Sequence, residues 1–262
     1  MSNSFSSKVA IVTGGSSGIG KEVAIRFVQL GGQVVIGGRD QIKLQQAANE
    51  IDSSGRDVRI VSGDIAKLET INSLVDIATQ AFGGVDVLFN NAGVFHPKPF
   101  LELTETEYSW FLDTILKGKF FMAQAAAKAM KLRGGGVIVQ TGSLWALQAI
   151  GATPSAAYSA ANAGVHALTK NLAIELAPEN IRINTVAPAV VETPVYNTFM
   201  SQDQVEKVLS TFNTFHPLGR NGQPADVATA ILFLASEQAG WITGTVIPVD
   251  GGVMAGRPIV KI

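Results

Sequence analysis

Short runs of β-branched and aliphatic residues alternate with longer helix-favouring stretches along nearly the whole chain of 262 residues. The runs are almost continuously apolar, which is typical of strands buried on both faces of a parallel sheet. Such alternation predicts a single-domain, doubly wound α/β fold, because right-handed crossovers place helices on both faces of the sheet. We expect about seven strands, at residues 9–12, 33–36, 58–61, 86–89, 137–139, 181–184 and 245–249.

Helical patterns fill the gaps between these strands and leave no linker, repeat or low-complexity tract between separate domains. Gly134-Gly135-Gly136 is interpreted as a tight connection from a helix to a strand, rather than as a domain boundary. One domain is therefore expected over residues 1–262, a length that suits a large α/β core. The expected helices cover residues 21–30, 41–53, 68–82, 105–131 and 157–176.

Composition and charge exclude several classes of function. The formal net charge of −1 gives no electrostatic basis for binding nucleic acid or an anionic membrane. The chain has no cysteine, and its three histidines show no spacing typical of a zinc site, so no metal is expected. No run approaches the ~18 apolar residues of a membrane span, and the first eight residues do not resemble a secretory signal. We expect a cytoplasmic protein whose partner is a small molecule.

The run from Thr13 to Gly20 follows the first predicted strand and opens the next helix. Gly14, Gly18 and Gly20 would allow a sharp turn and a close approach to a pyrophosphate, with Ser16, Ser17 and Ile19 beside it. The amides and positive dipole end of a helix N-terminus favour such an anion. A glycine-rich loop alone is weak evidence. Its place after the first strand, with Asn90-Asn91-Ala92-Gly93 after the fourth, indicates a dinucleotide site.

The end of the second strand bears on the choice of dinucleotide. An acidic side chain there would bind the adenosine ribose and repel a 2′-phosphate, but the chain has Gly38 followed by Arg39. A guanidinium pairs well with phosphate, and Ser16 offers a further hydrogen bond. Asp40 is expected to cap the following helix. These features favour NADP(H) as the cofactor, with NAD(H) as the alternative. The simpler explanation of Arg39 is a solvated charge on the surface.

Together with Tyr158 and Ser143, these motifs resemble the short-chain dehydrogenase/reductase family over about residues 8–254. The resemblance implies a Rossmann-like fold, a nicotinamide cofactor, and hydride transfer to a ketone or from a secondary alcohol. It implies a helical insertion over the active site at about 193–216, and a homotetramer. It also implies that the following residues contact the cofactor: Asp64 and Ile65 at the adenine, Asn91, Ala92, Gly93 and Thr141 beside the fourth and fifth strands, and Pro188, Val191 and Thr193 at the nicotinamide.

By the same resemblance, Tyr158 is the proton donor and Ser143 orients the substrate oxygen. Two members of the family's proton relay are missing, because Asn162 stands where a lysine is expected and Ile115 where an asparagine is expected. A tyrosine without a nearby cation keeps a pKa near ~10, so phenolate is scarce at neutral pH. We therefore expect weak activity biased toward reduction, with the Asn162 amide bonded to a ribose hydroxyl. Lys117 is expected to point away from the site, and neither Lys117 nor Lys119 is expected to replace the missing cation.

Two alternatives remain beside a carbonyl reductase. A cofactor-binding protein without catalysis would also keep the glycine turn, and it would account for Asn162 and Ile115. A substitution introduced in the laboratory would account for Asn162 but not for Ile115. His96 is interpreted as a residue of the pocket, of its rim or of the surface, His166 as a core or interface residue, and His216 as structural. Phe95, Trp145, Leu147, Ile150 and Tyr196 predict either an apolar substrate wall or ordinary core packing.

Overall fold

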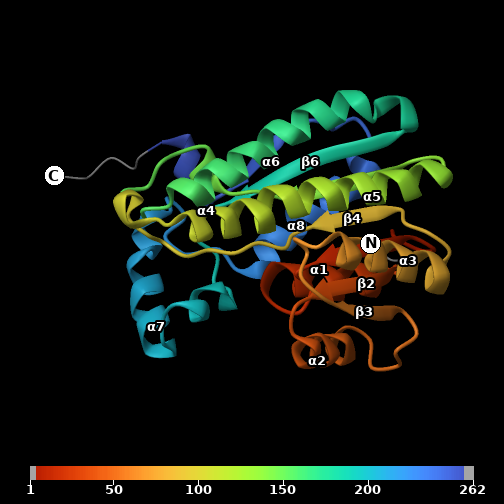
Figure 1. Cartoon of the computed structure of the whole chain (residues 1–262), viewed down its shortest axis with the longest axis horizontal. Helices are drawn as coiled ribbons and strands as arrows, with labels where there is room; N and C mark the ends of the chain where they lie inside the picture. The colour runs from red at the N-terminus through yellow and green to blue at the C-terminus, as the bar shows by residue number, and fades with distance from the viewer. Residues whose placement is uncertain (1–3, 257–262) are drawn as a thin grey trace.

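The computed structural model describes residues 4–256 and contains one parallel sheet of seven strands in the order β3-β2-β1-β4-β5-β6-β7 (Figure 1). The doubly wound sheet and all seven predicted strands are therefore confirmed. Residues 1–3 of the stretch that was tested for a secretory signal lie outside the described part of the chain. The strands are β1 (Val9–Thr13), β2 (Gln33–Gly38), β3 (Val58–Ser62), β4 (Val87–Asn90), β5 (Gly136–Thr141), β6 (Ile181–Pro188) and β7 (Val246–Val249).

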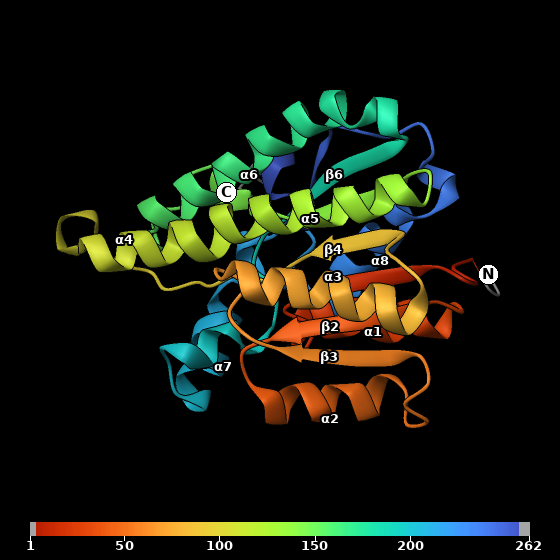
Figure 2. The ribbon, with the colours of Figure 1, turned by 45° about the vertical axis from the view of Figure 1, so that its right-hand side comes forward.

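Helices cover both faces of the sheet and bury its alternating side chains. On β1, Ala10 and Val12 pack into one hydrophobic cluster while Val9 and Ile11 pack into the other, as the two-residue period of a strand requires. One cluster lies under α1 (Gly18–Gln29), α2 (Gln41–Ile51) and α8 (Pro224–Ala235). The other lies under α3 (Leu68–Phe82), α5 (Gly118–Leu132) and α6 (Ala156–Glu175), which are nearer the viewer in Figure 2.

The long helix predicted over residues 105–131 is interrupted, so this boundary prediction was wrong. It consists of α4 (Glu105–Phe111), a π-helical segment η2 (Leu112–Lys117) and α5. At the end of η2 the amide of Gly118 donates to the carbonyl of Asp113, five residues back. Short π-helical segments are rare and occur frequently at functional sites. This one lies where the chain carries Ile115 and, just beyond it, Lys119.

The segment between β6 and α8 contains short helices and no strand of the sheet. It comprises η5 (Pro194–Thr198), α7 (Gln202–Thr211) and η6 (Asn213–Phe215). A capping box between Ser201 and Gln204 starts α7. Its apolar face buries Val205 and Leu209 against Leu144 and Trp145. Figure 1 shows α7 beyond one end of the sheet.

The remaining elements are single turns between the main layers. The predicted connection at Gly134-Gly135-Gly136 joins α5 to β5, and a Cβ at Gly135 would lie 2.6 Å from the carbonyl oxygen of Asn180. No helix within residues 4–256 combines the length and apolar character needed to cross a bilayer. The other short turns are η1 (Phe100–Glu102), η3 (Leu144–Ala146), η4 (Ala177–Glu179), η7 (Glu237–Ala239) and η8 (Val253–Ala255).

Candidate functional site

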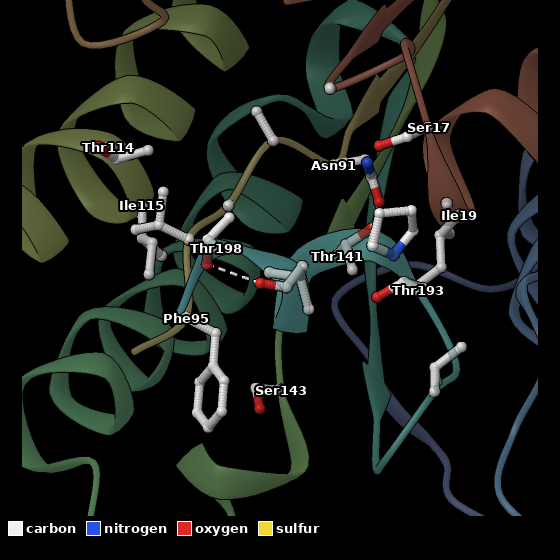
Figure 3. Close-up of a pocket in the computed structure, with 18 of the residues that line it drawn as sticks. Ser17, Ile19, Asn91, Phe95, Thr114, Ile115, Thr141, Ser143, Thr193 and Thr198 are labelled. Carbon is white, nitrogen blue, oxygen red and sulfur yellow. Dashed lines mark hydrogen bonds between the residues drawn. The ribbon is translucent and has the colours of Figure 1, made fainter. Parts of the chain in front are cut away.

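A cavity of about 540 Å³ opens at the carboxyl ends of the central strands. Figure 3 shows Ser17, Ile19 and Asn91 on one side of it, and Phe95 with Ser143 on another. Ligand sites in open α/β sheets occupy this edge, beside the point where the strand order reverses. All the predicted site residues except Gly20 line the cavity: Gly14, Ser16, Ser17, Gly18, Ile19, Arg39, Asp64, Ile65, Asn91, Ala92, Gly93, Thr141, Ser143, Tyr158, Asn162, Pro188, Val191 and Thr193.

The turn between β1 and α1 has the geometry that an anion requires. Gly14 and Gly18 adopt φ values of +68° and +54°, which side chains disfavour. Ser17 precedes α1 in an extended conformation, and its side chain does not cap the helix. The first amides of α1 therefore have no intrahelical acceptor and face the cavity at the positive end of the helix dipole. The residues present fit the pyrophosphate of a dinucleotide.

Thr13 and Gly20 hold this turn in place. The hydroxyl of Thr13 accepts from the amides of Asn91 and Ala92, both at 2.9 Å, and so joins the ends of β1 and β4. Gly20 does not line the cavity, and its contact with the cofactor stays a prediction. A Cβ at Gly20 would lie 2.3 Å from the carbonyl oxygen of Gly14. Its absence of a side chain lets α1 pack against the turn.

The end of β2 carries positive charge toward the cavity. Arg39 and Lys43 are both exposed and both line it, and sequence reasoning missed Lys43, which follows Arg39 by one helical turn. Asp40 accepts from the amides of Ile42 and Lys43 at 3.0 Å, so its predicted capping role is confirmed. Because the Asp40 carboxylate is engaged with α2, the two cations remain suited to a phosphate.

Tyr158, Ser143 and Asn162 meet at the junction of α6 and the end of β5. Ser143 is buried, its Oγ accepts from the amide of Trp145 at 3.2 Å, and its own amide donates to Nε2 of His166 at 3.4 Å. Burial raises the pKa of Tyr158 above its ordinary value of 10. Hydrogen bonding from the side chains of Ser143 and Asn162 opposes this increase without overcoming it. Tyr158 is therefore a neutral phenol at physiological pH.

Asn162 and Ile115, which the sequence analysis placed at relay positions, are both buried within this site. Asn162 is 2% exposed, and its Nδ2 donates to the backbone carbonyl oxygen of Tyr158 at 3.0 Å. The side-chain NH₂ group of Asn162 is therefore already hydrogen-bonded within α6, whereas the expected partner was a ribose hydroxyl. Ile115 lines the cavity and packs against Phe111 and Ala161. Neither Ile115 nor Asn162 contributes a charge to the site.

A lysine nevertheless lies in the cavity wall. Lys119 is 2% exposed and lines the cavity, and its Nζ donates to the carbonyl oxygen of Thr141, so the expectation that it does not replace the missing cation stays a prediction. The prediction that Lys117 points elsewhere is confirmed, since Lys117 is exposed and pairs with Asp113 at 3.4 Å. Residue counting could not reveal the position of Lys119, because the π-helical segment η2 ends just before it and shifts the direction of the side chains after it.

Aromatic rings form the wall opposite the glycine turn. The ring of Phe95 lies 5.0 Å from that of Tyr158 and 5.9 Å from that of Phe199. Of the predicted wall residues, Phe95, Trp145 and Tyr196 line the cavity, whereas Leu147 and Ile150 do not. Sequence analysis named neither Phe199 nor Phe212 individually, and both line the cavity. The remaining apolar lining comes from Val94, Pro97, Ile115, Pro194, Val195, Met200, Val208 and Leu209.

Two of the three histidines, His166 and His216, are buried, and the third, His96, is exposed. His166 is buried behind Ser143, as predicted for a core residue, and burial lowers its pKa to about 4. His216 is buried with its Nδ1 at 2.9 Å from the carbonyl oxygen of Phe212. His96 packs on Phe199 and does not line the cavity. Among residues 4–256, no three His, Cys, Asp or Glu side chains gather in an arrangement able to hold a metal.

Comparison with known proteins accords with this geometry. A family model described as enoyl-(acyl carrier protein) reductase matches residues 14–254. The chain is 37% identical to a 3alpha-hydroxysteroid dehydrogenase of Mediterraneibacter gnavus, over 93% of this chain and 96% of that protein. It is 35% identical to a cyclohexanol dehydrogenase of an Acinetobacter species, over 96% of both.

Solved structures show the same architecture. A short-chain type dehydrogenase/reductase from Mycobacterium marinum superposes with a TM-score of 0.90 at 33% identity, covering 96% of this chain and 97% of the other. A short-chain dehydrogenase/reductase from Caenorhabditis elegans, solved with cofactor, also gives 0.90, at 31% identity and 96% and 97% coverage. With its glycine turn, its Ser143–Tyr158 pair and these relatives, the chain belongs to the short-chain dehydrogenase/reductase family.

Proposed function

We propose that the protein is an NADP(H)-dependent oxidoreductase that interconverts a ketone and a secondary alcohol. The observation that carries this proposal is the presence of Tyr158 and Ser143 in the same cavity as the glycine turn of β1–α1. A protein that only bound the dinucleotide would need the turn but not the buried serine and phenol. The relatives are named as dehydrogenases of cyclic and steroid alcohols, which supports the same class of reaction.

The chain's own residues would act on the substrate oxygen. The Ser143 hydroxyl donates a hydrogen bond to the carbonyl oxygen, and Tyr158 gives that oxygen its proton. A bound nicotinamide dinucleotide would supply the hydride for the carbonyl carbon. The raised pKa of Tyr158 keeps the phenol protonated at neutral pH, as reduction requires. Oxidation needs the phenolate as base, so we propose that reduction is the favoured direction.

The shape of the wall supports an apolar, ring-containing substrate. Phe95, Trp145 and Tyr196 surround the approach to Tyr158, and Phe199 and Phe212 extend this surface. Such rings stabilise apolar cyclic groups through area burial and edge-to-face contacts. Within residues 4–256, three lysine or arginine side chains line the cavity: Arg39 and Lys43 at the end of β2, and Lys119, which is buried and donates to the carbonyl oxygen of Thr141. A cyclic or steroid-like ketone therefore suits the site better than an acidic one.

The proposed function is tested by offering NADPH with cyclohexanone-type, steroid, acyl-thioester and short charged carbonyl compounds. We expect NADPH oxidation with the apolar cyclic ketones and little with the charged ones. Product formation is followed by chromatography alongside the loss of NADPH absorbance. Saturable NADPH binding with no turnover across the whole panel would instead identify a binding protein without catalysis.

Replacing Arg39 by alanine should reduce the preference for NADPH over NADH by about tenfold, because a charge-assisted hydrogen bond contributes ~1.5 kcal/mol or more. Arg39 and Lys43 both face the cavity, so the double alanine variant should lose more than either single one. The measurement is kcat/KM for each dinucleotide with one ketone. Arg56→Ala, an exposed arginine on the loop after α2, is the matched control. An unchanged ratio in the double variant would contradict the assignment of NADP(H).

A further inference from the structure

Lys119 is a buried amine that the proposed reaction does not yet use. It projects from the first turn of α5 and is 2% exposed, although lysine is almost never buried without a partner. Its Nζ donates to the backbone carbonyl oxygen of Thr141 at the end of β5. The backbone oxygen of Lys119 accepts from Nδ2 of Asn90 at 2.9 Å, which ties this turn of α5 to the end of β4. The position of the amine is thus set from both neighbouring strands.

The amine lines the same cavity as the candidate catalytic pair. Its acceptor residue Thr141 precedes Ser143 by two residues, and hydrogen bonding by the Ser143 side chain counteracts the rise in the pKa of Tyr158. The amide of Ser143 donates to His166, whose pKa is lowered by burial and then by the charge of Lys119. Lys119, Ser143 and Tyr158 all line the same cavity.

Among residues 4–256, no carboxylate forms an ion pair with Lys119. The titratable groups on α6 around it are Tyr158, the buried His166 and the exposed Lys170, none of which is anionic at neutral pH. The facing strands present only neutral polar side chains, Asn90 and Thr141. Asp64, on the loop before α3, lines the cavity but is exposed, and Asp113 is paired with Lys117. Burial alone lowers the pKa of Lys119 to about 7.

We propose that Lys119 is the active-site cation of this protein, reaching the cavity from α5 in place of a lysine at position 162, and that its ammonium stabilises the negative charge that develops on Tyr158 during ketone reduction. The inference rests on the proposed function. Lys119 acts through Tyr158 and is therefore a positioning residue. The two positions are consistent with each other. The helical segment that carries Ile115 in place of the relay asparagine carries Lys119 four residues later, and α6 carries the amide of Asn162 in place of a lysine.

The proposal has a definite dependence on pH. When Tyr158 gives its proton to the substrate oxygen, the phenol becomes negative, and a nearby ammonium favours that change while a neutral amine does not. The ammonium form predominates below pH about 7, from the lowered pKa of Lys119. Reduction should therefore be faster at pH 6 than at pH 9, by about tenfold, which corresponds to ~1.36 kcal/mol of charge stabilisation.

The first test compares wild type, Lys119→Met and Lys117→Met in ketone reduction across pH 5.5–9.5. Wild type and Lys117→Met should show an inflection near neutral pH. Lys119→Met should lose about tenfold at pH 6 and little at pH 9, giving a flat profile. An equal loss at both pH values would show a merely structural role and overturn the proposal. A wild-type pH profile of ketone reduction that shows no inflection near neutral pH would also overturn the proposal, and this measurement requires no variant.

The second test needs no turnover and measures the ionisation itself by thermal unfolding without cofactor. Below pH about 7 the Lys119 amine is protonated in both the folded and the unfolded chain, and between pH about 7 and the ordinary lysine pKa of 10.5 only the unfolded chain keeps the proton. Because the unfolded state then binds more protons, wild-type stability should rise with pH from 7 to 9 relative to Lys119→Met. Lys117→Met should follow wild type.

The two tests separate the possible failures. If the thermal stabilities of wild type and Lys119→Met change with pH in the same way, the pKa of Lys119 is not lowered in the folded protein. That result would overturn this inference and leave the proposed function intact. If wild type reduces no ketone at any pH, the proposed function and the role given to Lys119 both fall. A folded Lys119→Arg variant should reduce the ketone as fast at pH 9 as at pH 6, because a guanidinium stays charged over this range.

Discussion

Replacing Tyr158 by phenylalanine is expected to lower kcat/KM for ketone reduction by about 10²–10⁴-fold, the usual contribution of a positioned general acid. The ring would keep its edge-to-face contacts with Phe95 and Phe111, at 5.0 and 6.3 Å, so the wall should stay in place. The affinity for NADPH should change little, because the glycine turn and the amides of α1 are untouched. Steady-state kinetics and a fluorescence titration of NADPH measure the two quantities separately.

Two further tyrosines provide matched controls for that substitution. Tyr196 also lines the cavity, and Tyr108 is exposed on α4. Tyr196→Phe should alter KM for bulky ketones more than kcat, and Tyr108→Phe should behave as wild type. A Tyr158→Phe enzyme that keeps most of its kcat would contradict the role of the phenol. Equal losses in Tyr158→Phe and Tyr196→Phe would indicate a role in packing instead.

The sheet and the glycine turn could be predicted because their signals are local. Parallel strands buried on both faces require continuous apolar runs such as Val9–Thr13, and each such run became a strand. A turn that needs positive φ at Gly14 and Gly18 is visible in the sequence because glycine tolerates it. The expected site residues then came together, since the carboxyl ends of parallel strands share one edge of the sheet. Only Gly20 serves packing rather than the cavity.

The position of Lys119 could not be predicted from the same signals. Counting residues along an uninterrupted α-helix from 105 to 131 assigns each side chain a direction, but the π-helical segment η2 changes the phase of everything after it. Only the structure shows that Lys119 then meets the carbonyl of Thr141. Lys43 and Phe199 were missed for a related reason, because α2 and the segment after β6 reach the cavity through tertiary packing.

Replacing Asn162 by lysine is expected to raise alcohol oxidation more than ketone reduction. A cation one helical turn after Tyr158 would lower the pKa of the phenol, and each unit corresponds to about 1.36 kcal/mol between the protonation states. A decrease of about two units would give on the order of 100-fold more phenolate at neutral pH, and oxidation depends on that form. Reduction uses the neutral phenol, which is already abundant. The measurement is kcat/KM in both directions across pH.

The size and the charge of the new side chain must be separated, because Asn162 is 2% exposed and a longer chain must find room. Asn162→Met supplies similar length without charge and should give no selective gain in oxidation. The gain from Asn162→Lys should be larger in a Lys119→Met background, because two ammonium groups in one desolvated cavity repel each other, and effects of neighbouring groups are not additive. If oxidation gains no more than reduction in that background, the missing charge at position 162 does not limit this site. A selective gain there, with a smaller one beside native Lys119, would mean that both positions serve the same phenol.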